Sequence, residues 1–201
     1  MTPEETKLPS VRLRAMEPED LDLLYTIEND TSLWSVGNTN VPYSRFALHQ
    51  FLEQQTGDIY CDKQVRLIVE NENGEVVGMA DLVNFVPAHQ RAEVGIVIKR
   101  SHRNQGYATA ALRQLEHYAR TTLHLHQLYA IVPSANRHSA RLFAHCQFSS
   151  QGVLADWLYD GTAYADALVM QKVLDASCRT TTQATDQTAN LDVDGTADKK
   201  N

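Results

Sequence analysis

Seven short runs along the chain are rich in apolar and β-branched residues, and several of them alternate apolar with polar positions. Such runs predict β-strands. They are Val11 to Met16, Val65 to Glu70, Glu75 to Val83, Ala92 to Ile98, Leu128 to Val132, Val153 to Tyr159 and Ala163 to Val173. Asn73-Gly74 and Asp160-Gly161 stand between neighbouring runs, and dipeptides of this kind favour tight hairpin turns. The sequence therefore predicts two β-hairpins within a larger sheet.

Four other segments repeat apolar residues every three or four positions, which predicts amphipathic helices. The first follows Pro18, a residue tolerated in the first turn of a helix, and places Leu21, Leu24 and Tyr25 on one side. The other three cover Ser44 to Gln55, Gly106 to Thr122 and Asn136 to Cys146. The order of elements, β-α-α-β-β-β-α-β-α-β-β, indicates a mixed α+β domain.

Composition divides the 201 residues into two parts. Residues 1–174 hold the predicted elements and are expected to form a single domain. Residues 175–201 contain no aromatic side chain and little aliphatic content, so they cannot bury enough surface to offset the entropy of ordering. We expect this segment to be a disordered C-terminal tail.

Charge and cysteine usage exclude several classes of protein. The formal net charge of −7 argues against a broad nucleic-acid-binding surface. No apolar stretch approaches the length of a membrane helix, and the start MTPEETKLPS lacks a signal pattern, so a cytoplasmic protein is expected. Three widely spaced cysteines suggest reduced thiols, and His124-x-His126 without a third ligand nearby is weak evidence for a metal. We therefore expect no metal site.

The stretch SHRNQGYATAALR places Gly106 between a predicted strand and a predicted helix. A helix start presents unpaired N–H groups and the positive end of the helix dipole, which together favour phosphate. Gly106 would let a ligand approach the amides, Ala108 would keep the first turn thin, and Arg103 could add a forked charge to a diphosphate. The alternative is a glycine that only turns the chain into the helix. No Walker or dinucleotide-binding pattern is present.

The order of these features resembles the GNAT superfamily of N-acetyltransferases. Arg103-x-x-Gly106-x-Ala108 follows a strand and opens a helix, and a buried strand and Asn136-x-x-Ser139 come next. The stretches HQRAEVGIVIKRSHRNQGYATAALRQLEHYA and LHQLYAIVPSANRHSARLF are most similar to the branch of spermidine and ribosomal-protein N-acetyltransferases. The resemblance implies an α+β fold with a mixed, mostly antiparallel sheet of about seven strands and helices on both faces. Its fourth and fifth strands, Ala92 to Ile98 and Leu128 to Val132, should splay apart.

The resemblance also implies a binding site for acetyl-CoA. The pantetheine arm should lie in the splay, on free backbone groups of the fourth strand, and Asn136 and Ser139 should hold it from the facing helix. Asn136 is equally well explained as the cap of that helix. The diphosphate should sit on the loop that opens the helix after the fourth strand. The residues expected to contact acetyl-CoA are Ile96, Val97, Ile98, Arg103, Asn104, Gln105, Gly106, Tyr107, Ala108, Thr109, Asn136 and Ser139.

The chemistry expected there is direct acetyl transfer to a primary amine. Only the neutral amine attacks a thioester, and a lysine-like amine is about 0.04 % neutral at pH 7, so a general base is needed. Glu93 is the expected base, working through a bound water, and Asp81 on the neighbouring strand is a second carboxylate. The alternative for Glu93 is a carboxylate paired with Arg91 or another basic residue that serves only packing. The backbone N–H of Val97 should polarise the thioester carbonyl.

Two positions depart from the family pattern Asn-x-x-Ser/Ala-x-x-x-Tyr-x-x-x-Gly-Phe. Phe143 stands where the tyrosine that protonates the leaving thiolate would be, and Gln147 replaces the glycine. We therefore expect neither the phenol donor nor the usual turn. Either the thiolate leaves unaided, or His145, Tyr129 or Tyr164 supplies the proton, or the chain is a catalytically weak acetyl-CoA-binding module.

The acceptor is expected to be a protein N-terminus, a polyamine or another small amine, and a homo-oligomer is possible. Asn38, Thr39, Asn40 and Asn84 stand where the spermidine enzymes are acidic, which weakens the case for spermidine itself. Glu28, Asp30 and Asp81 could still bind an ammonium group, or could be solvated surface charges. An acceptor cleft could be lined by Trp34, Val36, Val41 and Tyr43, which could equally fill the core.

Overall fold

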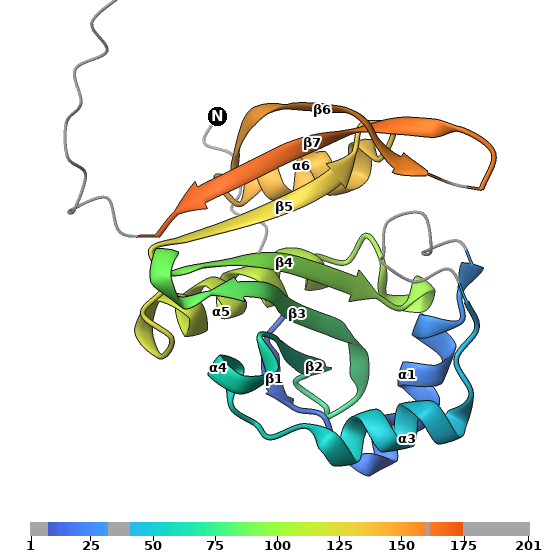
Figure 1. The fold of residues 1–201 in the computed structure, drawn as a ribbon. Coiled ribbons are helices and arrows are strands. Elements are labelled where there is room, and N and C mark those ends of the chain that lie inside the picture. The colour runs from blue at the N-terminus through green and yellow to red at the C-terminus, as the bar shows by residue number, and fades with distance from the viewer. Residues whose placement is uncertain (1–7, 32–40, 160, 175–201) are drawn as a thin grey trace, which may run out of the picture.

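The computed structural model describes residues 8–31, 41–159 and 161–174. Its centre is one seven-stranded sheet with the strand order β1-β2-β3-β4-β5-β7-β6 (Figure 1). Strands β4 and β5 are parallel, and every other neighbouring pair is antiparallel. The expected α+β fold with a mixed, mostly antiparallel sheet is confirmed. The expected tail, residues 32–40 and Asp160 lie outside the described residues.

The seven strands match the seven predicted runs. Their bounds are β1 Val11–Ala15, β2 Val65–Asn71, β3 Val76–Val86, β4 Arg91–Ile98, β5 Gln127–Pro133, β6 Ser149–Tyr159 and β7 Tyr164–Val173. Gly74 takes a positive φ of 76° in the predicted β2–β3 hairpin. β6 begins four residues earlier than predicted, because register shifts at Ser150/Gly152 and Leu154/Leu158 break the alternation on which the prediction relied.

The predicted helices are also present. They are α1 Leu21–Glu28, preceded by a 3₁₀ turn at Pro18–Asp20, α3 Arg45–Gln54, α5 Tyr107–Thr121 and α6 Arg137–His145. The Ser44 hydroxyl accepts a hydrogen bond from the Ala47 N–H and caps α3. The sequence did not predict α4, Ile59–Asp62, because a single turn is too short to show a helical period.

The helices cover both faces of the sheet, as expected. On one face α5 and α6 pack on Val77, Ala80, Leu82 and Val94. On the other face α1 and α3 enclose a smaller cluster of Leu24, Leu48, Ile68 and Met79. Each strand of the central part therefore presents alternate residues to two different cores.

The sheet is interrupted between β4 and β5. Their ladder comprises three pairs and ends at Glu93 and Tyr129. β4 continues to Ile98 and stays paired with β3, whereas β5 continues to Pro133 and stays paired with β7. Figure 1 shows the green strand β4 and the yellow strand β5 diverging from this point. The unpaired segments, residues 94–98 and 130–133, are called the splay below, and they confirm the splay that the resemblance implied.

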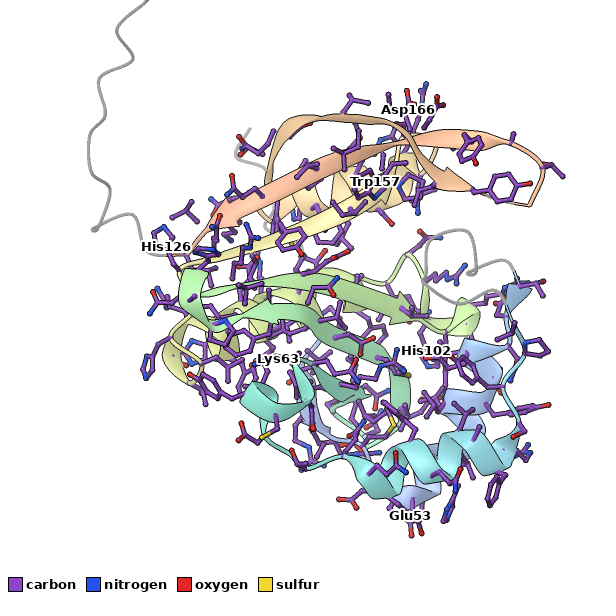
Figure 2. The ribbon with its side chains drawn as sticks, in the orientation of Figure 1. Glu53, Lys63, His102, His126, Trp157 and Asp166 are labelled. Atoms are coloured by element: carbon purple, nitrogen blue, oxygen red, sulfur yellow. The ribbon has the colours of Figure 1, made fainter. Side chains whose placement is uncertain are left out.

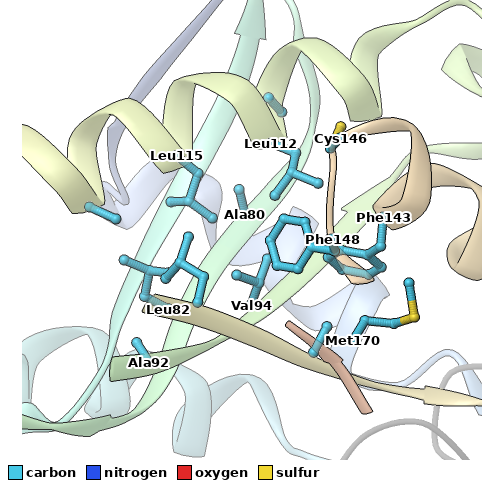
Figure 3. Packing of buried hydrophobic residues seen from close by; sticks show 14 of the residues in the cluster. Ala80, Leu82, Ala92, Val94, Leu112, Leu115, Phe143, Cys146, Phe148 and Met170 are labelled. Carbon is cyan, nitrogen blue, oxygen red and sulfur yellow. The ribbon is translucent and has the colours of Figure 1, made fainter. Parts of the chain in front are cut away.

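Contacts behind the sheet hold its two halves together. Lys172 Nζ on β7 lies 2.6 Å from Glu116 Oε2 on α5 and donates to the Cys146 carbonyl at the end of α6. Phe143 of α6 is 4 % exposed, and its ring meets that of Phe148 edge to face with centroids 5.0 Å apart. Figure 3 shows both rings in the apolar cluster with Leu112 and Met170. Phe143 therefore serves packing between α6 and the sheet.

The turn after α6 corrects one expectation. Gln147 adopts the left-handed conformation, with φ of 68°, that a glycine would adopt at this position. Its N–H donates to the Ala144 carbonyl, and the Phe148 N–H donates to the Phe143 carbonyl. The usual turn is thus kept without glycine, at the expense of the strain of an L-residue in the left-handed region.

Gln147→Gly is expected to stabilise the protein by about 1 kcal/mol, because glycine adopts a positive φ without steric strain. Chemical denaturation of the wild type and the variant measures the difference in the free energy of unfolding. Gln55, with φ of −65°, provides the matched control. Gln55→Gly should destabilise by about 0.5–1 kcal/mol, since glycine only adds freedom to the unfolded chain there. A loss of stability in both variants would contradict the assignment of strain to Gln147.

Candidate active site

The face of β4 that the sequence singled out is half-exposed. Ala92 and Val94 are buried, whereas Glu93, Gly95 and Val97 are intermediate in exposure, as the alternation predicted. The Asn84 Nδ2 donates a hydrogen bond of 2.8 Å to Glu93 Oε2. Asn84 reaches Glu93 from a break in the β3–β4 register, where its own φ is 50°. An amide thus holds the carboxylate where the sequence placed the base.

Tyr129 lies opposite Glu93 in the last pair of the β4–β5 ladder. Burial raises the pKa of its phenol, and the charge of Glu93 and a hydrogen bond to it raise that pKa further. The phenol therefore keeps its proton over the neutral range. A proton acceptor and a proton donor stand side by side at the point where the splay begins.

The backbone of β4 does not support the expected role of the Val97 N–H, which was to polarise the thioester carbonyl. Lys99 N–H donates to the Val77 carbonyl, and a Cβ built on Gly78 would lie 2.2 Å from the Val97 carbonyl oxygen, so that carbonyl faces β3. Residues of an antiparallel ladder alternate in the side to which their N–H and C=O point. The amide of Val97 is thus directed to β3, and those of Ile96 and Ile98 are directed to the splay. The Ile98 carbonyl already accepts from Arg103 Nε at 3.0 Å.

The loop before α5 offers unpaired amides, as anticipated. Gly106 is the N-cap residue with φ of 87°, and the first bond of the helix runs from the Ala110 N–H to its carbonyl. The N–H groups of Tyr107, Ala108 and Thr109 therefore precede the first helical acceptor and point out of the helix end. These donors fit an anionic diphosphate.

Side chains in this loop also shape the loop itself. Gln105 Nε2 donates to the Ser101 carbonyl, and Asn104 takes a positive φ of 61°. A Cβ on Gly106 would approach Pro9 Cδ to 3.0 Å and Leu8 Cδ2 to 3.3 Å. The glycine is therefore required by its backbone angle and by the N-terminal segment, whether or not a ligand approaches it.

The residues expected on α6 and on the β6–β7 hairpin, as a cosubstrate contact or as proton donors, lie in different surroundings. Asn136 Oδ1 accepts the Ser139 N–H at 3.1 Å, so Asn136 caps α6 directly after β5. His145 is exposed in the last turn of α6. Tyr164 is 67 % exposed, and its ring is tilted by 41° against that of Tyr159, with centroids 5.0 Å apart. Both belong to the hairpin that carries Trp157, which Figure 2 labels. Of the three proposed proton donors, Tyr129 is the one that the structure pairs with Glu93.

A charged group that the sequence did not single out lies beside this face. Arg66 Nη1 on β2 binds Glu28 Oε1 on α1, and Arg66 Nε lies 3.6 Å from Asp81 Oδ2 on β3. Burial raises the pKa of Asp81 to about 6 against the lowering effect of Arg66. Asp81 Oδ1 is buried and has no hydrogen-bond partner among the described residues. No local sequence signal marks Arg66, because its partners are distant in the chain.

A family model for the acetyltransferase (GNAT) domain matches residues 10–149, which is well over half of the chain. The chain belongs to the GNAT family. The spermidine N(1)-acetyltransferase of Escherichia coli K12 is 30% identical over 161 residues, covering 80% of this chain and 84% of that protein. This GNAT chain is an N-acetyltransferase that uses acetyl-CoA.

Solved structures agree with this assignment. The spermidine N-acetyltransferase from Vibrio cholerae, in complex with CoA and spermine, superposes with a TM-score of 0.73 at 25% identity. The match covers 82% of this chain and 95% of that one. A second structure of the same enzyme, at a TM-score of 0.69 and 24% identity, supports the fold alone.

Within residues 8–31, 41–159 and 161–174, no three histidine, cysteine or acidic side chains gather as metal ligands would. The helices of that same part of the GNAT chain include none long and apolar enough to cross a membrane.

The raised pKa of Asp81 predicts a pH dependence of stability. Because the folded state binds this proton more tightly than the unfolded chain, Asp81 adds stability that is complete below pH 3.8 and is lost as the pH rises through about 6. Asp81→Asn should therefore remove the gain in unfolding free energy that the wild type shows between pH 7.5 and pH 5. Glu53→Gln on α3 controls for the loss of one negative charge. Parallel pH profiles of wild type and Asp81→Asn would contradict the prediction.

Proposed function

We propose that this acetyltransferase transfers the acetyl group to a primary amine of a small polycation such as a polyamine. Three carboxylates, Glu28, Asp81 and Glu93, lie with two guanidinium groups, those of Arg66 and Arg91, on the half-exposed side of β2, β3 and β4, which leaves one negative charge in excess. This excess of negative charge attracts an ammonium group and repels an anionic acceptor. The spermidine enzymes to which the chain is similar act on a substrate of this kind.

The cosubstrate would lie along the splay. The amides of Ile96 and Ile98 would bind the pantetheine arm as an added strand does, and Asn136 and Ser139 would flank it from α6. The diphosphate would bind to the amides of the loop and first turn of α5, with Asn104, Gln105 and Arg103 around it. Bound there, acetyl-CoA supplies the activated acetyl group as a thioester.

The observation that carries the mechanism is the pairing of Glu93 with Tyr129 where the splay begins. Glu93 would take a proton from the ammonium group of the acceptor, directly or through a water, and so produce the neutral amine that attacks the thioester. Tyr129 would protonate the leaving thiolate, because its phenol stays protonated at neutral pH. This arrangement would replace the donor that Phe143 cannot supply.

The oligomeric state belongs to the same proposal. The second V. cholerae structure is described as dodecameric. In this chain the edge strand β6 and its hairpin expose Val153, Trp157, Tyr159 and Tyr164, each more than half accessible. Trp157 is labelled on this hairpin in Figure 2. Exposed apolar side chains of this kind are typical of contact surfaces. We expect a homo-oligomer that uses this hairpin.

Release of free CoA with a panel of amines tests the function. We expect turnover with spermidine or spermine well above that with an N-terminal peptide or an aminoglycoside. Background rates with all of them would leave the catalytically weak acetyl-CoA-binding module as the remaining function.

Tyr129→Phe should lower kcat by about 10²-fold or more with the KM for acetyl-CoA unchanged, because it removes a proton donor and keeps the ring. Tyr60→Phe, at an exposed tyrosine on α4, is the matched control.

Asn104→Asp tests the loop. The substitution is isosteric, the left-handed backbone tolerates aspartate, and the new charge would oppose the diphosphate. We expect the dissociation constant of CoA, measured by calorimetry, to rise about tenfold, the effect of one nearby like charge in partly hydrated surroundings. Gln54→Glu on α3 adds the same charge elsewhere and should leave binding unchanged. Equal affinities for Asn104→Asp and wild type would place the diphosphate on another surface.

A further inference from the structure

Three residues form a row across the central strands on the half-exposed side of the sheet. The register pairs Arg66 on β2 with Asp81 on β3, and Asp81 with Gly95 on β4. Gly95 is the second residue of β4 beyond the end of its ladder with β5. The row therefore leads from a guanidinium, through a carboxylate, to the edge of the splay.

Arg66 is fixed from several sides. It binds Glu28 on α1, lies 3.6 Å from Asp81 Oδ2, and stands over the Phe51 ring of α3 with Cζ 5.6 Å from the centroid. Its side chain is 20 % exposed. A guanidinium held between a helix carboxylate and an aromatic face keeps one orientation. Arg66 Nε is buried without a hydrogen-bond partner among the described residues, so at 3.6 Å it acts on the Asp81 carboxylate through its charge.

On the side of Asp81 that faces β4, the ladder places no side chain opposite the carboxylate group. Its Oδ1 is buried without a partner among the described residues, although buried carboxylate oxygens normally accept hydrogen bonds. The neighbour toward the splay is Gly95, which has no side chain. A Cβ there would lie 3.4 Å from Asp81 Cβ and 3.7 Å from Oδ2, at ordinary contact distance. The glycine thus leaves room beside the carboxylate at the edge of the splay, along which the cosubstrate is proposed to lie.

We infer that Arg66 is a positioning residue for the transfer reaction: it holds the ionised carboxylate of Asp81 beside Gly95, where that carboxylate binds the ammonium group of the acceptor. The inference rests on the proposed function, which supplies an ammonium-bearing acceptor. It assigns the binding of the cation to Asp81 and leaves the proton transfers to Glu93 and Tyr129.

The charges around Asp81 fit this division. The charge of Glu28 on α1 raises the pKa of Asp81, and that of Arg66 on β2 lowers it. Glu93 lies on the same side of the sheet, two residues before Gly95 on β4. α3 contributes Phe51, and Tyr43 lies near Arg66. With Arg66 removed, burial and the charge of Glu28 would both favour a protonated Asp81, which cannot bind a cation through charge.

Arg66→Met removes the charge and keeps a long apolar side chain. The expected result is a rise in the KM for the amine of about 10- to 100-fold at pH 7, the size typical of a lost charged contact. The KM for acetyl-CoA should stay unchanged. The acidic limb of kcat/KM should move to higher pH, so that the defect shrinks at pH 9. Arg66→Lys should move the acidic limb of kcat/KM part of the way back, because lysine has the positive charge but lacks the forked guanidinium geometry.

Two comparisons separate this role from a structural one. Arg12→Met breaks an ion pair of 2.6 Å with Glu70 on the outer strands and should leave the pH profile unchanged. The double variant Arg66→Met/Asp81→Asn should be no worse than Asp81→Asn alone, because Arg66 acts through Asp81. Losses of kcat/KM that add up in the double variant would overturn the inference. A loss of kcat/KM by the same factor at every pH in Arg66→Met would also overturn it.

Gly95→Ala addresses the row independently of Arg66. The methyl group fits without a clash, so the variant should fold with wild-type stability and raise the KM for the amine about tenfold by narrowing the space beside Asp81. An unchanged KM would overturn the placement of the ammonium group there.

NMR titration of the Asp81 carboxyl carbon keeps the inference apart from the proposed function. If the wild type acetylates no amine, the proposed function fails, yet Arg66→Met must still raise the titration midpoint of Asp81 if Arg66 holds it ionised. An unmoved midpoint would overturn the role of Arg66 even in an active enzyme.

Discussion

The end of the β4–β5 ladder after Glu93 and Tyr129 is the constraint on which the site depends. Backbone donors and acceptors inside a sheet are normally paired, and a segment that leaves them unpaired must have another partner. β4 stays straight because β3 pairs with it up to Ile98, and β5 leaves because β7 pairs with it through Pro133. The two halves are kept at a fixed distance by the helices behind them, where Lys172 joins β7 to α5 and α6. A stable splay therefore requires a continuous core on the opposite side.

The splay also separates charge along the strands. One end meets the amide-rich start of α5 with Arg103 beside it, and this end suits the diphosphate of the cosubstrate. The other end holds Glu93, Asp81 and Glu28, and it suits a cation. Neither substrate is attracted to the place of the other, so electrostatics alone would orient the pair for transfer. The net charge of −7 of the whole chain is consistent with a cationic acceptor.

Most of the fold was predictable because its signals are local. The Asn73-Gly74 turn, the Ser44 cap and the apolar repeat of α5 each lie within a few residues of sequence, and the structure has all three. What could not be predicted depends on partners distant in the chain. Arg66 meets Glu28 across 38 residues, and that ion pair follows only from the packing of α1 on the sheet. Gln147 in a left-handed turn was unpredictable for another reason: the packing of α6 and Phe148 overrides its local preference.

The buried position of Phe143 explains how a departure from the family motif can be tolerated. Its ring packs against Phe148 and so belongs to the core that fixes α6 and, through it, the far side of the splay. A phenol there would have to find a partner for its hydroxyl group in an apolar cluster. Tyr129 meets no such difficulty, because it extends from the strand itself and its partner, Glu93, is set by the same ladder pair that ends the pairing. Moving the proton donor from the helix to the strand would free α6 from the proton transfer, while donor and acceptor stay next to each other in one ladder pair.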